Sequence, residues 1–328
     1  MTRSKRATST DVARVAGVSR TTVSFVLNNR GDQSIPEETR RRVRAAAALL
    51  DYRPHSSARS LAAGRSDVVL LAVPDLPIGP SITRFVEQLA AALTEHGLTL
   101  VTHLASAGGR SLPDVCATVG ASAVIGFGGF DSETVATLHR AGAQVVTPAD
   151  AAEGGTGPVM GAVGRLQAEH LVDRGHRRLG YAMPAHPAYR DMARERLDGV
   201  AAFCRDAGLD EPLTLTVGLD VDEAADAVGR WKAASVTAVC AFNDETAIAV
   251  LAGAHASGVP TPSELAVIGV DDVPTAALTV PALSTVTFDL HELGRHRARS
   301  VAAALTGGPA PPTPGTPREL RVVHRSST

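Results

Sequence analysis

Short apolar runs that alternate with amphipathic segments are the feature that most constrains how this chain folds. The runs begin at residue 67, are rich in Val, Leu, Ile and Ala, and have the length of buried strands. The segments between them show helical spacing of apolar residues, and several end at glycine. Because strands that alternate with helices form parallel sheets covered on both faces, residues 66–328 are predicted to form an α/β body.

The predicted strands are "DVVLLAVPD", "LTLVTHLA", "SAVIGFGG", "GAQVVTP", "RRLGYAMP", "LTLTVG", "TAVCAFND" and "LAVIGVDD". The predicted helices include "SITRFVEQLAAALTEHG", "GAVGRLQAEHLVDRG", "ARERLDGVAAFCRDAG" and "DETAIAVLAGAHASG". Ligands bind such sheets beyond the carboxyl ends of the strands. Asn243 and Asp271 follow apolar runs there, and their amide and carboxylate groups suit the hydroxyls of a sugar-like ligand. Asp244 and Asp272 more often cap the next helix or turn.

The charge distribution separates the first 65 residues from the rest of the chain. The 328 residues carry a formal net charge of −2, but residues 1–65 hold 13 Lys and Arg against 5 Asp and Glu, a net of +8. The remainder holds 19 basic against 29 acidic residues, a net of −10. A basic module on an acidic body indicates a polyanion partner for the first part alone, although a solvated basic face remains the plain alternative.

Composition and motifs argue against several classes of protein. The chain is 44% hydrophobic and 20% charged, as in globular proteins, and no apolar run reaches the roughly 18 residues of a membrane span. The basic N-terminus lacks the apolar core and cleavage site of a secretory signal. Three scattered cysteines suggest neither a disulfide framework nor a zinc site. "GFGGFD" resembles a phosphate loop only in its glycines, and Lys5 and Lys232 are the two lysines, so no P-loop, catalytic motif, cofactor or metal is expected.

Residues 9–29 have the pattern of two short helices separated by a turn. "STDVARVAG" starts with capping residues, has an apolar face and ends at Gly17. Ser19 is placed to cap a second helix, "RTTVSFVLNN", in which Val23, Val26 and Leu27 share one face. The opposite face and its flanks carry Arg20, Thr21, Thr22, Ser24, Phe25 and Asn28. This pattern is typical of a helix-turn-helix, whose second helix enters the major groove of DNA.

A third helix is predicted over "PEETRRRVRAAAALL", with Pro36 near its start and a basic face from Arg40 to Arg44. A plain three-helix bundle with a solvated face is the alternative to a DNA-binding headpiece. Charge, spacing and capping together favour the headpiece.

At this point the sequence resembles the lactose-repressor/purine-repressor (LacI/GalR) family of bacterial transcription regulators. The headpiece resemblance rests on "DVARVAGVSRTTVSFVLNN", "ETRRRVRAAAALLDYRP" and "ARSL". It continues through "EHLVDRGHRRLGY", "RERLDGV", "AVCAFNDETAIAVL", "GVPTPSELAVIGVDD" and "PALSTVTFDLHELGR", and it weakens between about 103 and 165. The family implies an all-α helix-turn-helix headpiece joined to a body like the periplasmic sugar-binding proteins, with two parallel-sheet subdomains around a cleft.

The resemblance also implies the domain boundaries. The headpiece is expected at 1–53, a hinge helix at 54–65 and the effector-binding and dimerisation body at 66–328. Within the body, the N-subdomain is expected at about 66–158 and 291–308. The C-subdomain is expected at about 159–290 and 317–325.

The expected DNA contacts combine the polar helix face with residues that the family implies. In the family, the hinge leucine, here Leu61, is inserted into the minor groove, and an apolar wedge there unstacks a base step. An alternative is that Leu61 caps the core below it. At Phe25 many relatives carry Arg or His, which donate to bases, whereas Phe can only make apolar contacts. The expected contacts are Thr8, Arg20, Thr21, Thr22, Ser24, Phe25, Asn28, Tyr52, Arg59 and Leu61.

The expected effector contacts follow from the family in the same way. Arg194, Asn243 and Asp271 match positions that hold effectors in relatives, with structural capping as the alternative. Ser81 and Phe288 stand at pocket positions where relatives often carry other residues, because "NPFF" is replaced by Gly-Pro-Ser-Ile and a Gln by Phe288. An Asp-Asn pair common in relatives is also replaced by Val159-Met160, so the pocket is expected to be less polar than in relatives, or degenerate.

The sequence therefore predicts a cytoplasmic, nucleoid-associated regulator, a repressor that binds a pseudo-palindromic operator as a homodimer or a tetramer. A sugar-like or nucleoside-like effector sets its affinity for DNA. A helix-turn-helix fused to a small-molecule-modifying enzyme domain, and a binding protein for transport, are the rival functions.

Overall fold

The computed structural model of this chain describes residues 7–27, 35–52, 66–75, 79–105, 108–126, 129–147, 157–287, 289–309, 311 and 320–328. The chain divides into two compact units, Met1–Asp67 and Val68–Thr328. We call the first unit the headpiece and the second the body. No helix within the described ranges is long and apolar enough to cross a bilayer.

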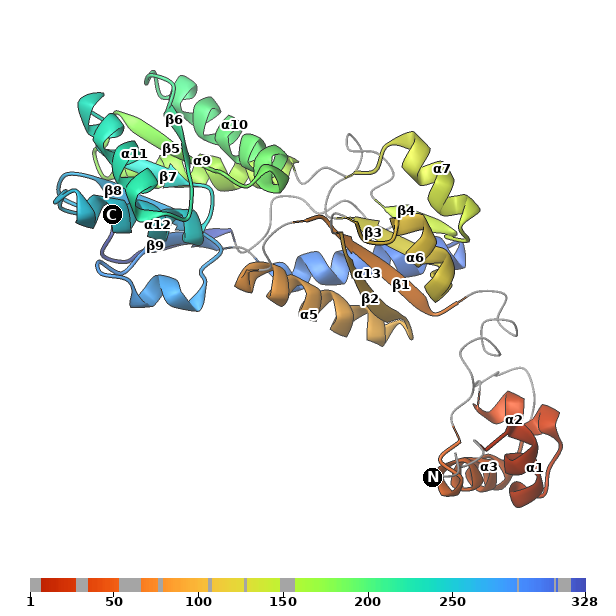
Figure 1. The fold of residues 1–328 in the computed structure, drawn as a ribbon. Coiled ribbons are helices and arrows are strands. Elements are labelled where there is room, and N and C mark those ends of the chain that lie inside the picture. The colour runs from red at the N-terminus through yellow and green to blue at the C-terminus, as the bar shows by residue number, and fades with distance from the viewer. Residues whose placement is uncertain are drawn as a thin grey trace. The chain divides into compact units, whose positions relative to one another are not determined.

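The headpiece is built from three short helices, α1 (Ser9–Ala16), α2 (Arg20–Leu27) and α3 (Glu37–Leu49), as the sequence predicted (Figure 1). α1 ends at Gly17, whose φ of 65° is the left-handed conformation that glycine adopts most easily. The N-cap of α1 is Thr8, one residue before the predicted capping residues. Its side chain and that of Asp11 each accept from the other's backbone N–H.

The body contains two sheets, and each forms the centre of one lobe (Figure 1). We call the lobe around the four-stranded sheet, with strand order β2-β1-β3-β4, the first lobe. All of its described strand pairs are parallel. Its elements are β1 (Val68–Val73), α5 (Pro80–Glu95), β2 (Thr99–Leu104), α6 (Leu112–Val119), β3 (Ala123–Gly126), α7 (Ser132–Arg140), β4 (Val145–Thr147) and α13 (Leu290–Thr306).

The second lobe surrounds a six-stranded sheet with the order β10-β9-β8-β7-β5-β6. Its strands are β5 (Leu179–Pro184), β6 (Leu213–Val217), β7 (Ala238–Ala241), β8 (Ala266–Val270), β9 (Ser284–Thr287) and β10 (Arg321–Val323). Its helices are α9 (Gly157–Asp173), η1 (Pro187–Tyr189), α10 (Arg190–Asp206), α11 (Val221–Ala233), α12 (Asp244–Ala256) and η2 (Pro274–Leu278). The sheet is mixed rather than purely parallel, because β10 pairs with β9 in the antiparallel direction.

Helices cover both faces of each sheet. Successive side chains of a strand point to opposite faces, so each strand packs against helices on both sides. In β1, Val69 and Leu71 pack with α5 and α13, whereas Leu70 packs with α6 and α7. In the second lobe, α11 and α12 cover one face and α9 and α10 the other. Trp231 of α11 is fully buried, and its indole N–H donates to the Leu213 carbonyl at 2.9 Å.

Glycines on α9 and α10 let these two helices touch backbone to backbone. A Cβ on Gly164 of α9 would lie 1.9 Å from the Arg196 carbonyl oxygen, and a Cβ on Gly199 of α10 would lie 1.9 Å from that of Gly161. Neither position tolerates a side chain without moving a helix. This close crossing fixes the position of α10 relative to α9 and the sheet beneath them.

This packing predicts that Gly199→Ala lowers the free energy of unfolding by about 1–3 kcal/mol or more, since overpacking forces the backbones apart. Gly229→Ala is the matched control, because Gly229 lies in the exposed face of α11 with open space at its Cβ position. Alanine there should be neutral or stabilise by up to about 1 kcal/mol. Chemical denaturation of both variants measures the difference, and equal stability of the two would contradict the packing described.

Candidate functional site

The headpiece presents a polar helix face opposite its core. Val23 and Val26 of α2 are 1% and 3% exposed, whereas Arg20, Thr21 and Ser24 are exposed. Ser19 caps this helix, because its hydroxyl accepts from the Thr22 N–H at 3.0 Å.

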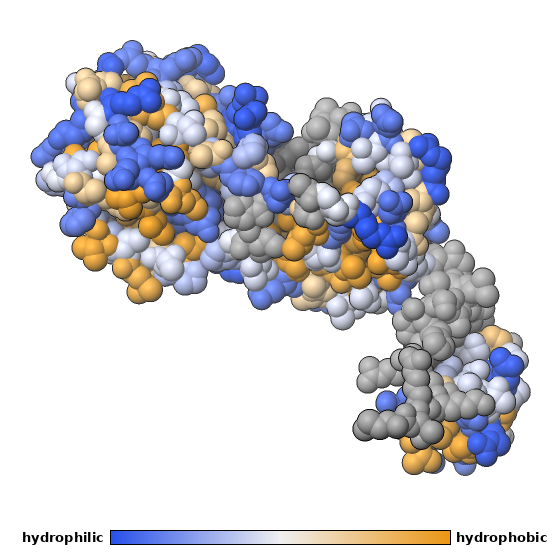
Figure 2. Space-filling view, viewed as in Figure 1, coloured by the Kyte–Doolittle hydropathy of each residue, from blue (hydrophilic) through white to orange (hydrophobic). Residues whose placement is uncertain are grey.

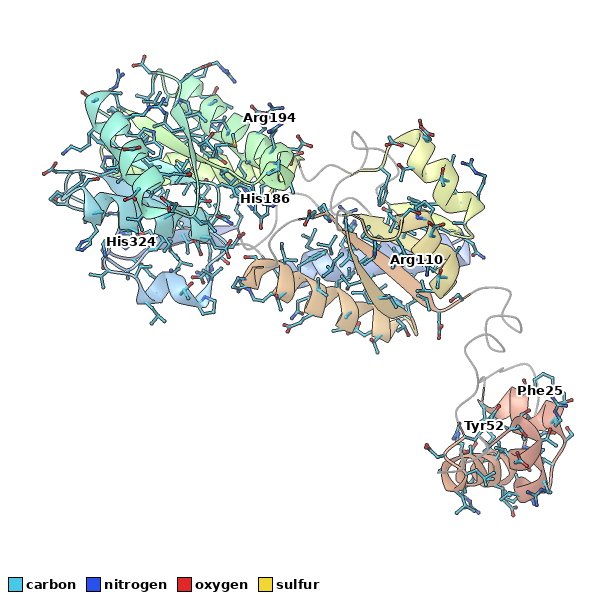
Figure 3. The ribbon with its side chains drawn as sticks, viewed as in Figure 1. Phe25, Tyr52, Arg110, His186, Arg194 and His324 are labelled. Carbon is cyan, nitrogen blue, oxygen red and sulfur yellow. The ribbon has the colours of Figure 1, made fainter. Side chains whose placement is uncertain are left out.

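Phe25 also lies on α2, half-buried, and its ring projects from the headpiece (Figure 3). It offers apolar surface where the other outer side chains offer hydrogen bonds.

Basic side chains on α3 extend this polar surface. Arg41, Arg42 and Arg44 are exposed, and Val43 between them is fully buried in the headpiece core. Tyr52 follows α3 and packs partly against the same core. Guanidinium groups on the outside of a helical module are suited to phosphate contacts.

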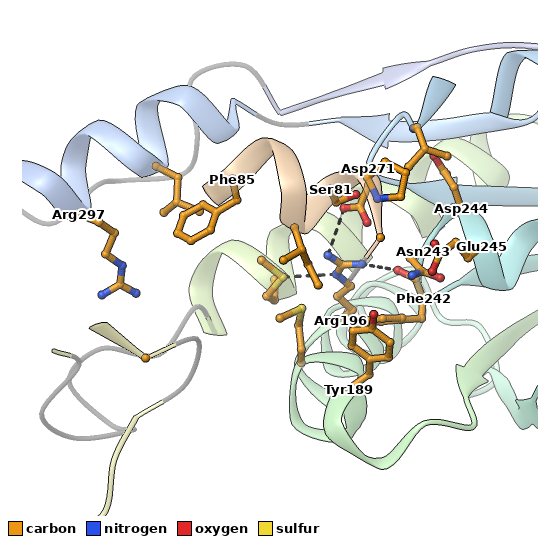
Figure 4. Close-up of a pocket in the computed structure, with 18 residues that line it drawn as sticks. Ser81, Phe85, Tyr189, Arg196, Phe242, Asn243, Asp244, Glu245, Asp271 and Arg297 are labelled. Atoms are coloured by element: carbon orange, nitrogen blue, oxygen red, sulfur yellow. Dashed lines mark hydrogen bonds and ion pairs between the residues drawn. The ribbon is translucent and has the colours of Figure 1, made fainter. Parts of the chain in front are cut away.

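The body contains a pocket whose walls come from both lobes. In the first lobe they come from the start of α5, the end of β3 and α13. In the second lobe they come from η1, α9, α10 and the residues after β7 and β8 (Figure 4). The lining residues are Gly79, Pro80, Ser81, Ile82, Phe85, Gly126, Met160, Tyr189, Met192, Arg196, Phe242, Asn243, Asp244, Glu245, Asp271, Val273, Leu293 and Arg297.

Arg196 is the buried cation at the centre of this pocket (Figure 4), with only 2% of the residue exposed. Its Nη1 donates to the Phe242 carbonyl, its Nε approaches the Met160 sulfur at 3.4 Å, and its Nη2 lies 3.6 Å from Asp271 Oδ1. The guanidinium carbon also lies 4.6 Å from the centroid of the Phe242 ring, in cation–π range. A buried charge is tolerated when it is paired and hydrogen-bonded in this way.

Asp271 begins a strained turn at the carboxyl end of β8. It and Asp272 have φ values of 104° and 49°, a region that non-glycine residues rarely adopt. The Asp271 N–H donates to the Val286 carbonyl at 2.8 Å, and Arg325 pairs with Asp272 at 2.6 Å. These contacts hold the Asp271 carboxylate at the pocket, beside Arg196.

Asn243 and Asp244 lie at the carboxyl end of β7 and act first as structural groups. The Asn243 amide oxygen caps α12 by accepting from the Thr246 N–H at 2.9 Å. Asp244, fully buried, accepts from the Val273 N–H at 2.8 Å and the Thr285 hydroxyl at 2.6 Å. Each of these side chains therefore holds a neighbouring segment in place while it lines the pocket.

Two ionisable groups on the second-lobe side of the pocket have raised pKa values. Burial and then the Asp271 charge raise the pKa of Glu245. Burial, followed by the charges of Glu245 and Asp271, raises the pKa of Tyr189 to about 12. Burial is the larger cause for both groups, and the neighbouring carboxylates add to it.

The rest of the pocket is largely apolar, as expected from the missing polar residues. Ile82 and Phe85 of α5, Leu293 of α13 and Met192 of α10 line it, and Tyr189 and Phe242 pack with ring centroids 5.2 Å apart. Such a lining favours a ligand with an apolar face and a small number of polar groups.

The chain matches known proteins along nearly its whole length. A family model described as bacterial regulatory proteins, lacI family, matches residues 8–55. A model of periplasmic binding protein-like domains matches residues 168–328. The HTH-type transcriptional regulator MalR of Streptomyces coelicolor is 30% identical over 325 residues, covering 92% of this chain and 91% of that protein. The chain belongs to the lacI family of bacterial regulatory proteins.

Further relatives and solved structures agree with the lacI-family assignment. The ribose operon repressor of Bacillus subtilis is 28% identical, covering 89% of this chain and 90% of that protein. A lac repressor dimer bound to operator and the anti-inducer ONPF has the same fold, with a TM-score of 0.76, 22% identity and coverage of 98% and 99%. The transcriptional regulator CelR in complex with cellobiose has a TM-score of 0.66 and 28% identity, with coverage of 98% and 100%. This lacI-family chain is thus a helix-turn-helix transcriptional regulator.

The pocket of this lacI-family protein contains three of the five predicted effector residues. Ser81, Asn243 and Asp271 line it, and Phe288 lies outside the described residues. The prediction that Arg194 contacts the effector is corrected, because Arg194 is exposed on α10 and does not line the pocket (Figure 3).

Helical geometry explains why Arg196 takes the place expected for Arg194. Two positions along a helix differ by about 200° in direction, so these arginines point to opposite sides of α10. The buried positions of α10 are Ala193, Arg196, Gly199, Val200 and Cys204. In "ARERLDGVAAFC", Arg196 lies three residues after Ala193 and four before Val200, and this helical spacing is the signal that identifies it as the inward arginine.

Sequence reasoning also missed Gln167, which is fully buried on α9. Its amide nitrogen reaches three carbonyls at the ends of β7 and β8, those of Ala241 at 2.8 Å, Gly269 at 3.2 Å and Ile268 at 3.3 Å. It holds together the two strand ends that carry Asn243 and Asp271. A lone glutamine in an amphipathic helix gives no sequence signal for this role.

The structure describes some of the predicted DNA-contact residues, and others lie outside the described ranges. Arg20, Thr21, Ser24 and Phe25 lie on the outer side of α2, and Thr22 is half-buried. Thr8 caps α1 and is exposed. Asn28, Arg59 and Leu61 lie outside the described residues.

Asp244 makes the stability of the body depend on pH. Burial raises its pKa from an ordinary value of 3.8 to about 7, against the lowering effect of the Thr285 and Val273 hydrogen bonds. The folded state therefore favours the protonated acid, and its stabilising contribution is full below about pH 3.8 and is lost as the pH rises through about 7.

We expect the unfolding free energy of the wild type, relative to Asp244→Asn, to fall between about pH 4 and 8. Thr285→Val removes a hydrogen bond that lowers this pKa, so the fall should extend to higher pH, while its onset, set by the unfolded state, stays at about pH 4. Denaturation at a series of pH values measures both shifts, with Asp210→Asn, an exposed carboxylate, as the control. Parallel curves for all four proteins would show that Asp244 does not titrate in this range.

Proposed function

We propose that this chain is a repressor whose affinity for an operator is set by a small molecule bound in the body pocket. The observation that carries the proposal is the pairing of two features in one lacI-family chain. One is an exposed polar face on a capped second helix, and the other is a pocket organised by the buried Arg196–Asp271 pair. The name of the ribose operon repressor supports the direction of regulation.

The proposed DNA target is a pseudo-palindromic operator, bound by two headpieces of a homodimer. Arg20, Thr21, Ser24 and Phe25 would face base edges, and the arginines of α3 would face phosphates. We assign residues 54–65 to a hinge, with Leu61 as a minor-groove wedge and Arg59 beside it. Thr8, Thr22, Asn28 and Tyr52 complete the proposed contacts. A location in the cytoplasm, at the nucleoid, follows from this target.

A dimer of the body is supported by the exposed apolar side chains of the second lobe. Leu278 and Val280 are 78% and 92% exposed, and Leu219 is 70% exposed. Figure 2 shows hydrophobic side chains gathered on the lower part of this lobe. Apolar patches on an otherwise polar surface commonly mark interfaces between proteins. The lac repressor with the same fold is likewise described as a dimer.

The effector proposed for the pocket is a sugar-like or nucleoside-like molecule with an apolar face. Asp271, the Asn243 amide and Ser81 would meet its polar groups, Arg196 would hold Asp271 in position, and Phe288 is proposed as a further wall. The aromatic ring of Tyr189 offers a surface on which a sugar or a base could stack. The cellobiose bound to CelR supports a carbohydrate ligand.

Selection on random DNA tests the proposed function. The wild type should enrich a pseudo-palindromic motif, and Phe25→Ala should change the preferred bases, because a good base contact contributes about 1–3 kcal/mol of discrimination. Arg42→Ala, a phosphate-contact variant on α3, should weaken all sequences alike and keep the motif. Failure of the wild type to enrich any motif, or an identical motif for Phe25→Ala, would contradict the assigned recognition face.

A further inference from the structure

We infer that Arg84 and Glu245 are coupling residues that dock the first turn of α5 against the second lobe, so that pocket occupancy and lobe closure share one set of contacts. This deepens the proposed function and rests on it for the ligand. The inference names two positioning residues, one in each lobe, that act through the pocket wall they hold.

Arg84 makes the first of these contacts. It lies one turn into α5, and its Nη2 donates to the main-chain carbonyl of Asp271 in the second lobe. Its Nε is buried and has no hydrogen-bond partner among the described residues. Burial removes water from this guanidinium, and the hydrogen bond to the Asp271 carbonyl offsets part of that cost. The docked arrangement is therefore favoured only while this carbonyl is in place.

The carbonyl of Asp271 is held in place by the strained turn. The positive φ of Asp271 is a strained backbone conformation for a non-glycine residue, so surrounding contacts must maintain it. Val286 receives its N–H, Arg196 pairs with its carboxylate, and Arg84 binds its carbonyl oxygen. One residue thus carries both the pocket's acidic group and the attachment of α5.

Glu245 makes the second contact, at the first residue before α5. A Cβ built on Gly79 would lie 2.8 Å from Glu245 Oε1, which is closer than real side chains approach. Gly79 has a φ of −86°, which any residue adopts, so the backbone does not require glycine here. The atom that such a Cβ would meet is the end of the Glu245 side chain, so the carboxylate lies in contact with Gly79 and would have to move aside for a side chain there.

The position of Glu245 is also favourable electrostatically. Gly79 is the N-cap of α5 and supplies no side-chain cap. The N-terminus of a helix attracts negative charge, so it favours the Glu245 carboxylate that lies beside Gly79. Each lobe thus contributes one charged side chain. Arg84 of the first lobe binds a carbonyl of the second lobe, and Glu245 of the second lobe lies at the N-terminus of α5, so the two contacts together define one docked orientation of α5.

The docked turn is itself a wall of the pocket. Pro80, Ser81, Ile82 and Phe85 lie between or beside the two contacts and line the cavity. A ligand that touches both this wall and Asp271 must bind the docked and undocked states with different affinity. Such a difference is what allows a ligand to shift a conformational equilibrium.

A double-mutant cycle of Gly79→Asp and Glu245→Ala tests the docking without any ligand. Donor and acceptor dyes on cysteines introduced at Arg110 of the first lobe and Asp226 of the second, both exposed, report the distance between lobes by energy transfer. The native Cys116, Cys204 and Cys240 are buried and free, so the dyes mark the introduced sites.

Gly79→Asp should lower the mean transfer efficiency, because the new carboxylate repels that of Glu245 and α5 undocks. In the Glu245→Ala background the same substitution should have no effect. Arg84→Met should also lower the efficiency, whereas Arg140→Met, which removes an exposed arginine of α7, should leave it unchanged.

An unchanged efficiency for both Gly79→Asp and Arg84→Met would overturn the inference. So would an equal effect of Gly79→Asp in the two backgrounds, because the new carboxylate would then act without Glu245. The readout needs neither DNA nor effector, so it separates this inference from the proposed function: loss of the DNA motif with an intact cycle would reject only the function.

Discussion

The buried guanidinium of Arg196 is the interaction on which the body depends most. It draws together the backbone end of β7, the thioether of α9 and the carboxylate that follows β8. Without it, the partly buried Asp271 carboxylate would lose the cation with which it pairs, at a cost of several kcal/mol. The pair therefore fixes where the two polar strand ends meet, and the apolar walls complete the pocket around them.

Close helix packing places this cation. Arg196 faces the pocket because α10 crosses α9 at Gly164 and Gly199, where backbone touches backbone. Gln167 on α9 then joins the carboxyl ends of β7 and β8. Small residues and one buried amide thus set the geometry in which charged groups can be buried.

Much of this fold could be read from local pattern, because its signals are local. Caps, glycine stops and apolar faces predicted the three headpiece helices, and short apolar runs predicted β1 to β8. β9 escaped notice because Ser284 and Thr285 make it look polar, although both are fully buried. β10 has three residues, too few to give a pattern, and its antiparallel pairing could not be foreseen.

The site was predictable only where one residue follows one strand. Asn243 and Asp271 were predicted because they follow apolar runs. The role of Arg196 depends on which face of α10 it occupies, and matching the family motif pointed instead to Arg194, two residues earlier. Contacts between distant segments gave no signal at all. Nothing in "GPSI" indicates that the carboxylate of Glu245 lies against Gly79.

The central claim is that a ligand organised by Arg196 in the body controls DNA binding by the headpiece. The most direct test titrates the selected operator by fluorescence anisotropy, with and without the compound that most raises the melting temperature in a screen of sugars and nucleosides. Arg194→Lys should respond to the compound as the wild type does. Arg196→Lys should bind operator normally and lose the response, as should Asp271→Asn. A full response from Arg196→Lys and Asp271→Asn, or its loss in Arg194→Lys alone, would contradict the account.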